Sequence, residues 1–232
     1  MKNLLFGAIL LLYGMAYPQS KDPDIILKKV IETFDKVKDY VVDVQVRVDV
    51  DFIKVPDTKA KIFFKQPDKI NFESEGFAML PKEGINFSPL SFVKKDYTAL
   101  YQKEDYIDAH PVSVIKVIPS SNQGDIVLTT LWVDQSSSII RKVESTTKTN
   151  GTFTIDLKYD DAAKNYFLPS SMVFGFNIDK MNLPKAFSDQ AETESRKNIG
   201  KSTYGKVYIT YYNYRINKGI SDKIFEKKKK NN

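Results

Sequence analysis

The segment 42–52 alternates without interruption between apolar and polar side chains. Valine or phenylalanine occupies each even position, and the odd positions carry Asp43, Gln45, Arg47, Asp49 and Asp51. Because successive side chains of a strand point to opposite faces of a sheet, this pattern predicts a long strand with one buried face and one solvated face. Such strands are typical of antiparallel sheets, so we expect the chain to fold around one.

Further strands are predicted at the spacing expected of an up-and-down sheet. They cover 59–65, a short segment with Ile70 and Phe72, then 97–102, 112–118, 126–133, 139–147, 152–159, 171–178 and 206–216. Between two of these strands, Asn150 and Gly151 favour a type I′ hairpin turn, because both central positions of that turn need positive φ.

One amphipathic helix is predicted over 22–38, ahead of all the strands. Asp22 is its expected N-cap, Pro23 takes the first helical position, and apolar side chains recur at helical spacing at Leu27, Val30, Ile31, Phe34 and Val37. A single apolar stripe has to cover another apolar surface. The expected fold is therefore mainly β with α: an incomplete antiparallel β-barrel of about ten strands with a covering N-terminal helix and a lid segment.

The composition removes the parts that most catalytic and metal sites need. The chain has no cysteine and one histidine, His110. Thiolate nucleophiles, zinc–thiolate sites and Ser-His pairs therefore lack a component. There is no glycine-rich phosphate loop or nucleophile motif, and paired carboxylates occur only at polar strand positions or in turns. We expect no enzyme activity, no catalytic residue, no metal site and no cofactor.

The first sixteen residues have the pattern of a secretory signal peptide. Lys2 supplies the basic start, residues 4–12 the apolar stretch, and Gly14 and Ala16 the small residues of a cleavage site. The mature chain is expected to begin at residue 17, with a cut after Ser20 as the alternative, and to form one domain to residue 232. No cysteine follows the cleavage site to accept a lipid. An exported chain without disulfides fits the periplasm of a Gram-negative bacterium.

The positive charge is concentrated at the ends of the chain. The formal net charge is +6, and it falls to +1 without Lys2 and the four lysines of 227–230. The body of the chain has no basic stripe, so no nucleic-acid partner is expected, and we expect a monomer. The lysine-rich tail, 227–232, is either a solvated end or a weak contact with anionic membrane.

Two segments interrupt the strand pattern. The first, 77–92, is unusually apolar for a connection and is interpreted as a lid, with ordinary core packing under a long loop as the alternative. Its expected lid residues are Phe77, Met79, Leu80, Phe87, Leu90 and Phe92. The second, 179–205, is interpreted as a mobile excursion, with a functional arm as the alternative.

Several segments together resemble a known family. They are 34–40 (FDKVKDY), 62–70 (IFFKQPDKI), 131–134 (LWVD), 152–155 (TFTI) and 213–217 (NYRIN). Their order and spacing, over nearly the whole mature chain, resemble the periplasmic lipoprotein carriers, the LolA-like outer-membrane lipoprotein-sorting proteins. The resemblance implies a half-open β-barrel with helices across its mouth and an apolar cavity for acyl chains. Where the best-known members place an arginine that holds the lid closed, this chain has Gln66, so that interaction is not implied.

The expected function is that of a non-enzymatic carrier or binder of lipoproteins or other acylated molecules. An inner-membrane ABC-type exporter and an outer-membrane acceptor are the implied partners. The alternative is an envelope-stress sensor that binds mislocalised lipoproteins and signals to a protein partner. The residues expected to line the acyl-chain cavity are Val44, Val46, Val48, Ile62, Phe64, Phe72, Leu128, Trp132, Phe153 and Phe174. A barrel filled by its own side chains remains the other interpretation of the same pattern.

Overall fold

The computed structural model describes residues 21–50, 56–74, 96–120, 124–160, 166–177 and 204–226. The expected signal peptide (1–16), the lid (77–92), residues 179–203 of the excursion and the lysine-rich tail (227–232) lie outside these ranges. The described residues form one α-helix, a short 3-10 helix and ten strands. The helices are α1 (Pro23–Phe34) and η4 (Asp222–Phe225).

The strands follow the predicted order along the chain. They are β1 (Asp39–Asp49), β2 (Thr58–Lys65), β3 (Lys69–Ser74), β4 (Tyr97–Ile107), β5 (His110–Pro119), β6 (Ile126–Asp134), β7 (Ile140–Thr147), β8 (Thr152–Lys158), β9 (Ser171–Asn177) and β10 (Tyr204–Ile216). β10 begins inside the expected excursion, so its first two residues belong to the sheet.

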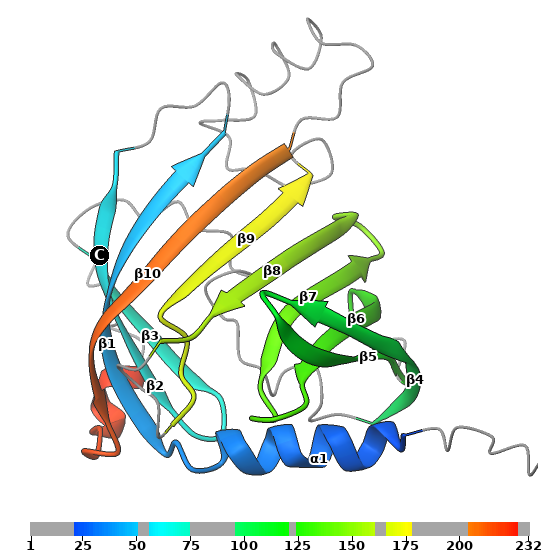
Figure 1. Cartoon of the computed structure of the whole chain (residues 1–232). Coiled ribbons are helices and arrows are strands. Elements are labelled where there is room, and N and C mark those ends of the chain that lie inside the picture. The colour runs from blue at the N-terminus through cyan, green and yellow to red at the C-terminus, as the bar shows by residue number, and fades with distance from the viewer. Residues whose placement is uncertain are drawn as a thin grey trace, which may run out of the picture.

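All ten strands belong to one antiparallel sheet in the order β3-β2-β1-β10-β9-β8-β7-β6-β5-β4. The last strand inserts between β1 and β9, and every other neighbour is consecutive in sequence. The sheet is strongly curved, and α1 lies along one end of it (Figure 1). β3 and β4 are the edges, and no pairing among the described residues joins them. The expected incomplete barrel is confirmed.

The alternation along β1 separates two faces of the sheet. Val42, Val44 and Val46 are at most 3% exposed, whereas Gln45 and Arg47 are exposed. We call the face that carries these valines the inner face and the opposite one the outer face. The buried core lies on the inner face, and the apolar residues of α1 belong to the same cluster.

The start of α1 is as predicted. The Asp22 carboxylate accepts a hydrogen bond from the Asp24 backbone N–H at 2.9 Å, and Pro23 follows the cap. The helix then buries Leu27, Val30 and Phe34 against the sheet. Three residues spaced three and four apart share one side of a helix, which is why a single stripe covers the core.

The helix ends at Phe34 rather than at residue 38. The Val37 N–H donates to the Phe34 carbonyl at 2.9 Å, which tightens the chain after the last turn. The Lys38 N–H then donates to the side-chain oxygen of Asn217 at 2.7 Å. Because Asn217 comes from the far end of the chain, this local sequence could not reveal where the helix stops.

The tight hairpin turn lies at a place other than the predicted one. At Asn150-Gly151 only Gly151 has positive φ, 71°, and the Thr146–Thr152 pair leaves a longer loop, so the type I′ prediction is wrong. Between β4 and β5, Asp108 and Ala109 both have positive φ, 46° and 64°. That pair has the geometry of a type I′ turn, although alanine is an unfavourable residue for it.

Candidate functional site

Eight of the ten residues expected to line an acyl-chain cavity share the inner face. The register places Ile62 opposite Val42, and Phe72 opposite Ile62, so three strands present one continuous row. The eight residues are Val44, Val46, Val48, Ile62, Phe64, Phe72, Phe153 and Phe174. They form one apolar surface together with residues that the sequence analysis did not include; contact with an acyl chain stays a prediction.

Leu128 and Trp132 lie on the outer face, so the expected set divides. Trp132 pairs with Val114 and Lys142, whereas its neighbour Leu131 belongs to the inner core. The Lys142 ammonium lies 5.0 Å from the centroid of the Trp132 ring, a cation–π contact on the surface of the sheet. Because β6 is apolar on both faces, its periodicity could not decide which face points inward.

The register identifies the inner-face residues that sequence reasoning missed. Once one residue of a strand is placed, each cross-strand partner shares its face. The additional members are Tyr40, Val42, Ile115, Leu131, Val143, Ile155, Met172, Phe176, Val207, Ile209, Tyr211 and Tyr214. Extending the alternation of β1 across the pairings would have found most of them, but the pairings are not readable from the sequence.

The inner face carries almost no charge. Among the described strand residues on this face, the side chains are aliphatic, aromatic, small or hydroxyl-bearing. The exception is Glu104, which lies opposite Ser113 near the tip of the β4–β5 hairpin and pairs with Lys21 at 2.6 Å. A surface of this kind favours neutral apolar ligands, since burying an unpaired ion is costly.

Four tyrosines place hydroxyl groups in this apolar surface. Burial raises the pKa of each hydroxyl well above its usual value, so all four are neutral at physiological pH. They are Tyr40, Tyr159, Tyr211 and Tyr214. Each can therefore donate one hydrogen bond and accept others.

Three of the four hydroxyl groups have partners. Tyr159 and Tyr214 donate to backbone carbonyl oxygens at 2.7 and 2.8 Å, and the Tyr211 oxygen lies 3.9 Å from the Met172 sulfur. Tyr40 forms no hydrogen bond with any residue that the structure describes. Its ring is half-buried.

An aromatic cluster joins α1 to β2, β1 and β10. The ring centroids of Phe34 and Phe64 are 5.5 Å apart, and Phe64 stacks on Tyr40 at 5.0 Å. Tyr40 in turn meets Tyr214 edge-on at 5.7 Å. These contacts hold the end of the helix against β2, β1 and β10.

A β-bulge brings two tyrosines of β10 to the same face. Tyr211 is opposite Val44, and the pairing between β1 and β10 then shifts by one residue. Asn213, with a φ of 57°, is the extra residue, so Tyr214 returns to the inner face. The two tyrosine rings stack at 6.2 Å.

The exposed part of the inner face borders the open side of the sheet. The core is fully buried on the central strands, where Val143, Ile155 and Phe174 are 0% exposed. Half-buried members of the same surface lie on the edge strands and on α1: Ile70, Phe72, Tyr97, Ala99, Ile26 and Ile31. Among the described residues, the inner face is therefore least covered beside β3, β4 and α1.

One polar pair is enclosed within the apolar surface. The hydroxyl oxygens of Thr129 and Ser145 are 2.7 Å apart, and the two residues are 1% and 0% exposed. Each satisfies the other across β6 and β7, which is how two polar side chains can occupy core positions.

Asp134 is buried at the turn between β6 and β7, and its role is structural. Burial alone would raise the pKa of this carboxyl, but hydrogen bonds from Ser136, Arg141 and the Ser137 backbone outweigh burial and hold the pKa well below its usual range. The Arg141 Nε–Asp134 distance is 2.6 Å, and His110 Nδ1 lies 3.5 Å away. This network fixes the turn, and nothing in it faces the inner surface.

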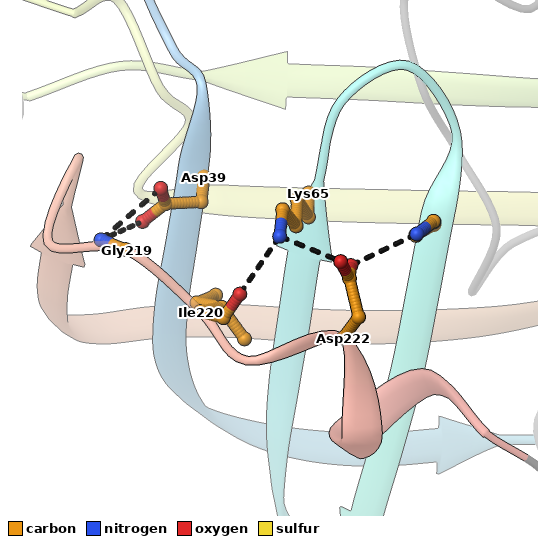
Figure 2. A network of polar contacts seen from close by, with 6 residues as sticks. Asp39, Lys65, Gly219, Ile220 and Asp222 are labelled. Atoms are coloured by element: carbon orange, nitrogen blue, oxygen red, sulfur yellow. Dashed lines mark hydrogen bonds and ion pairs between the residues drawn. The ribbon is translucent and has the colours of Figure 1, made fainter.

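The C-terminal segment fastens the β2–β3 hairpin to the rest of the sheet (Figure 2). The Asp39 carboxylate accepts from the Gly219 N–H at 3.1 Å. The Lys65 ammonium donates to the Ile220 carbonyl at 2.9 Å and pairs with Asp222 at 3.0 Å. These contacts join the start of β1, the end of β2 and the segment before η4.

Gln66 also contacts the link between α1 and β1. Its side-chain amide donates to the Val37 carbonyl at 2.7 Å and lies 3.5 Å from a carboxylate oxygen of Asp35. Gln66 thus makes a neutral hydrogen bond to the segment that follows the helix.

A hollow of about 390 Å³ on the outer face of β1–β3 is lined by polar side chains, among them Asp43 and Lys61, which pair at 3.4 Å. No cluster of three or more metal-ligating side chains occurs within the described ranges. No helix in them is long and apolar enough to span a membrane.

Solved structures with the same fold are found from three bacteria. A LolA superfamily protein from Nitrosomonas europaea is 14% identical with a TM-score of 0.60, and the match covers 88% of this chain and 97% of that one. A DUF1329 family protein from Desulfovibrio piger is 12% identical with a TM-score of 0.58, over 89% and 98% of the two chains.

The third solved structure is that of an outer-membrane lipoprotein-sorting protein domain, so named, from Vibrio parahaemolyticus. It is 12% identical with a TM-score of 0.54, over 89% of this chain and 98% of that one. No protein-family model and no curated protein matches the sequence. The fold of this chain is LolA-like.

Proposed function

We propose that this chain, with its LolA-like fold, is a non-enzymatic periplasmic carrier or binder of lipoproteins or other acylated molecules. The observation that carries the proposal is the inner face, which is almost wholly apolar across the ten described strands of a sheet whose edges, β3 and β4, do not pair with each other in the described residues. Acyl chains would lie on this face, under the aromatic cluster that includes Phe64 and Tyr40.

Burial of apolar surface alone can make the binding of an acyl chain favourable, without any catalytic group. Hiding an acyl chain of about 16 carbons from water is worth on the order of 12 kcal/mol, taking about 0.8 kcal/mol per methylene. Apolar burial is non-directional, so one surface can accept chains of different length and origin. This tolerance suits a carrier of many acylated molecules.

The compartment and the partners belong to the same proposal. Residues 1–16 would direct export, and an inner-membrane ABC-type exporter and an outer-membrane acceptor would load and unload the carrier. The mature chain is expected to begin at residue 17. Intact mass spectrometry of the periplasmic fraction would measure the mass of that chain. Genes for a sigma factor and an anti-sigma factor beside the gene of this chain would instead favour the alternative function, that of an envelope-stress sensor.

The direct test is mass spectrometry of lipids that co-purify with the chain from its native periplasm. Acylated species should be recovered, and the purified chain should bind a fluorescent fatty-acyl probe. Recovery of no acylated species, together with no binding of the probe, would overturn the proposal.

Phe72 offers a matched substitution. It is half-buried on the edge strand β3 and belongs to the inner face, so Phe72→Asp should weaken probe binding at least about tenfold by placing a charge on the apolar surface. Leu100→Asp is the control, because Leu100 is 51% exposed on β4 and lies opposite Lys116 on the outer face. Equal effects of the two substitutions would contradict the assignment of the inner face.

A further inference from the structure

The loop between β7 and β8 contains the one asparagine of the sequence that is followed by glycine, Asn150-Gly151. Both residues are half-buried, and Gly151 has a φ of 71°. Asparagine is chemically labile in proteins, because its side-chain carbon Cγ can be attacked by the backbone nitrogen of the next residue. Glycine has no Cβ to shield that nitrogen, so the pair is the sequence most open to this attack.

The hydrogen bonds of this loop leave out the atoms that would react. Asn150 Oδ1 is buried without a hydrogen-bond partner, and Asn150 Nδ2 donates to no residue that the structure describes. The Gly151 N–H likewise has no acceptor within the described ranges. Folded proteins seldom leave a buried carbonyl oxygen unpaired, because that state costs free energy. The folded chain therefore gains no side-chain hydrogen bond by keeping this carboxamide intact.

Other contacts hold the loop around these atoms. The Thr147 N–H and hydroxyl donate to the Gly151 carbonyl at 2.8 and 2.9 Å, and the Asn150 N–H donates to the Thr147 hydroxyl oxygen at 2.9 Å. The Thr149 hydroxyl donates to the Asp125 carboxylate at 3.0 Å. None of these donors and acceptors is consumed by a bond between the Gly151 nitrogen and Asn150 Cγ. The fold thus keeps the two reacting groups as neighbours without occupying either of them.

Other asparagines of the described chain are held by their side chains. The Asn71 Nδ2 donates to the Ile224 carbonyl at 2.7 Å. Both ends of the Asn217 carboxamide are bonded to backbone groups, at 2.7 and 2.8 Å. Each of the two is followed by a residue with a side chain. Cyclisation at these positions would break hydrogen bonds that Asn150 does not have.

We infer that Asn150 is a site of spontaneous covalent modification in the folded chain, through a succinimide formed with Gly151. The Gly151 nitrogen loses its proton to solvent and bonds to Asn150 Cγ; the Cγ–Nδ2 bond breaks, and Nδ2 takes up a proton and leaves as ammonia. Water then opens the ring. Opening at Cγ gives aspartate, and opening at the backbone carbonyl gives isoaspartate, in which the chain runs through Cγ. This inference is independent of the proposed carrier function.

The experiment measures conversion at Asn150, Asn71 and Asn217 by peptide mapping with mass spectrometry. The full mature chain is incubated folded in buffer and unfolded in urea, so that the ratio of the two rates at each asparagine removes the effect of the local sequence. Folding should change the rate at Asn150 by less than about threefold and slow Asn71 and Asn217 at least about tenfold. The rate at Asn150 should rise with pH, because the Gly151 nitrogen attacks only after losing its proton.

Asn150→Gln is the matched control. It keeps a carboxamide, but its cyclisation would need a six-membered ring, so conversion at this position should disappear while Asn71 and Asn217 behave as in the parent chain. Reference peptides distinguish aspartate from isoaspartate, and both products should appear at Asn150. A rate at Asn150 that folding slows more than about tenfold would show that the fold protects the site and would overturn the inference. Aspartate without isoaspartate, or equal conversion in Asn150→Gln, would also overturn it, since neither passes through the succinimide.

Discussion

Asp134 shows how one side chain can stabilise a turn and set the acid limit of the fold. Hydrogen bonds from Ser136, Arg141 and Ser137 to its carboxylate hold the pKa below the ordinary value of 3.8 despite burial. The folded state therefore binds fewer protons than the unfolded chain at acid pH. This contribution is fully present above about pH 4 and is lost as the pH falls from there towards the folded-state pKa.

Asp134→Asn should lower the free energy of unfolding near neutral pH by about 2–4 kcal/mol, because Arg141 loses its buried partner. The difference from the parent chain should narrow as the pH falls below about 4, where the unfolded carboxyl takes up protons. Urea unfolding across the acid range measures both effects. Asp222→Asn, at an exposed ion pair with Lys65, is the control and should change the free energy of unfolding much less, because solvent screens that pair. A difference that stays constant with pH would contradict this account.

Asn213 is a single residue that sets the direction of side chains along the strand β10. Its φ of 57° and the shifted register with β1 allow both Tyr211 and Tyr214 to face inward. Glycine adopts this conformation freely, whereas a β-branched residue does not.

Asn213→Gly should therefore remain within about 1 kcal/mol of the parent in stability. Asn213→Val should cost roughly 1–3 kcal/mol more than the glycine variant. Deleting Asn213 would remove the extra residue and place Tyr214 directly opposite Val42, so Tyr214 and Ile216 should keep the inner face and the buried-tyrosine ultraviolet signal should be retained. Thermal unfolding of the three variants gives the comparison; equal stability of the glycine and valine variants would show that the bulge relaxes without strain.

The elements that sequence reasoning predicted are those whose pattern is local. The β1 alternation gave the inner face of that strand, and Asp22 with Pro23 gave the start of α1. Two of the wrong predictions depended on distant parts of the chain. Trp132 lies on the outer face because register, and not the apolar run around it, decides its side. The helix ends early at a contact with Asn217, and no local signal indicates that partner.

At the scale of the whole molecule, the charged and apolar surfaces are separated by the sheet. The outer face carries ion pairs such as Lys61 with Asp43, and the inner face of the described strands carries its one carboxylate at the rim. β10 joins β1 to β9, and the segment after it fastens the β2–β3 hairpin, so the sheet keeps its curvature while β3 and β4 remain edges.

This separation predicts how binding should respond to salt and temperature. A neutral acyl ester on the inner face displaces no counter-ions, so its Kd should change by less than about twofold between about 50 mM and about 500 mM NaCl. Burial of apolar surface should give a negative heat capacity of binding, measured by titration calorimetry at several temperatures. Attraction of anionic lipid by the net charge of +6 would instead weaken steeply with salt. If the neutral ester also lost affinity about tenfold over that range, its site would have to lie on the charged outer surface, because the one carboxylate of the described inner face, Glu104, lies at the rim and is paired with Lys21.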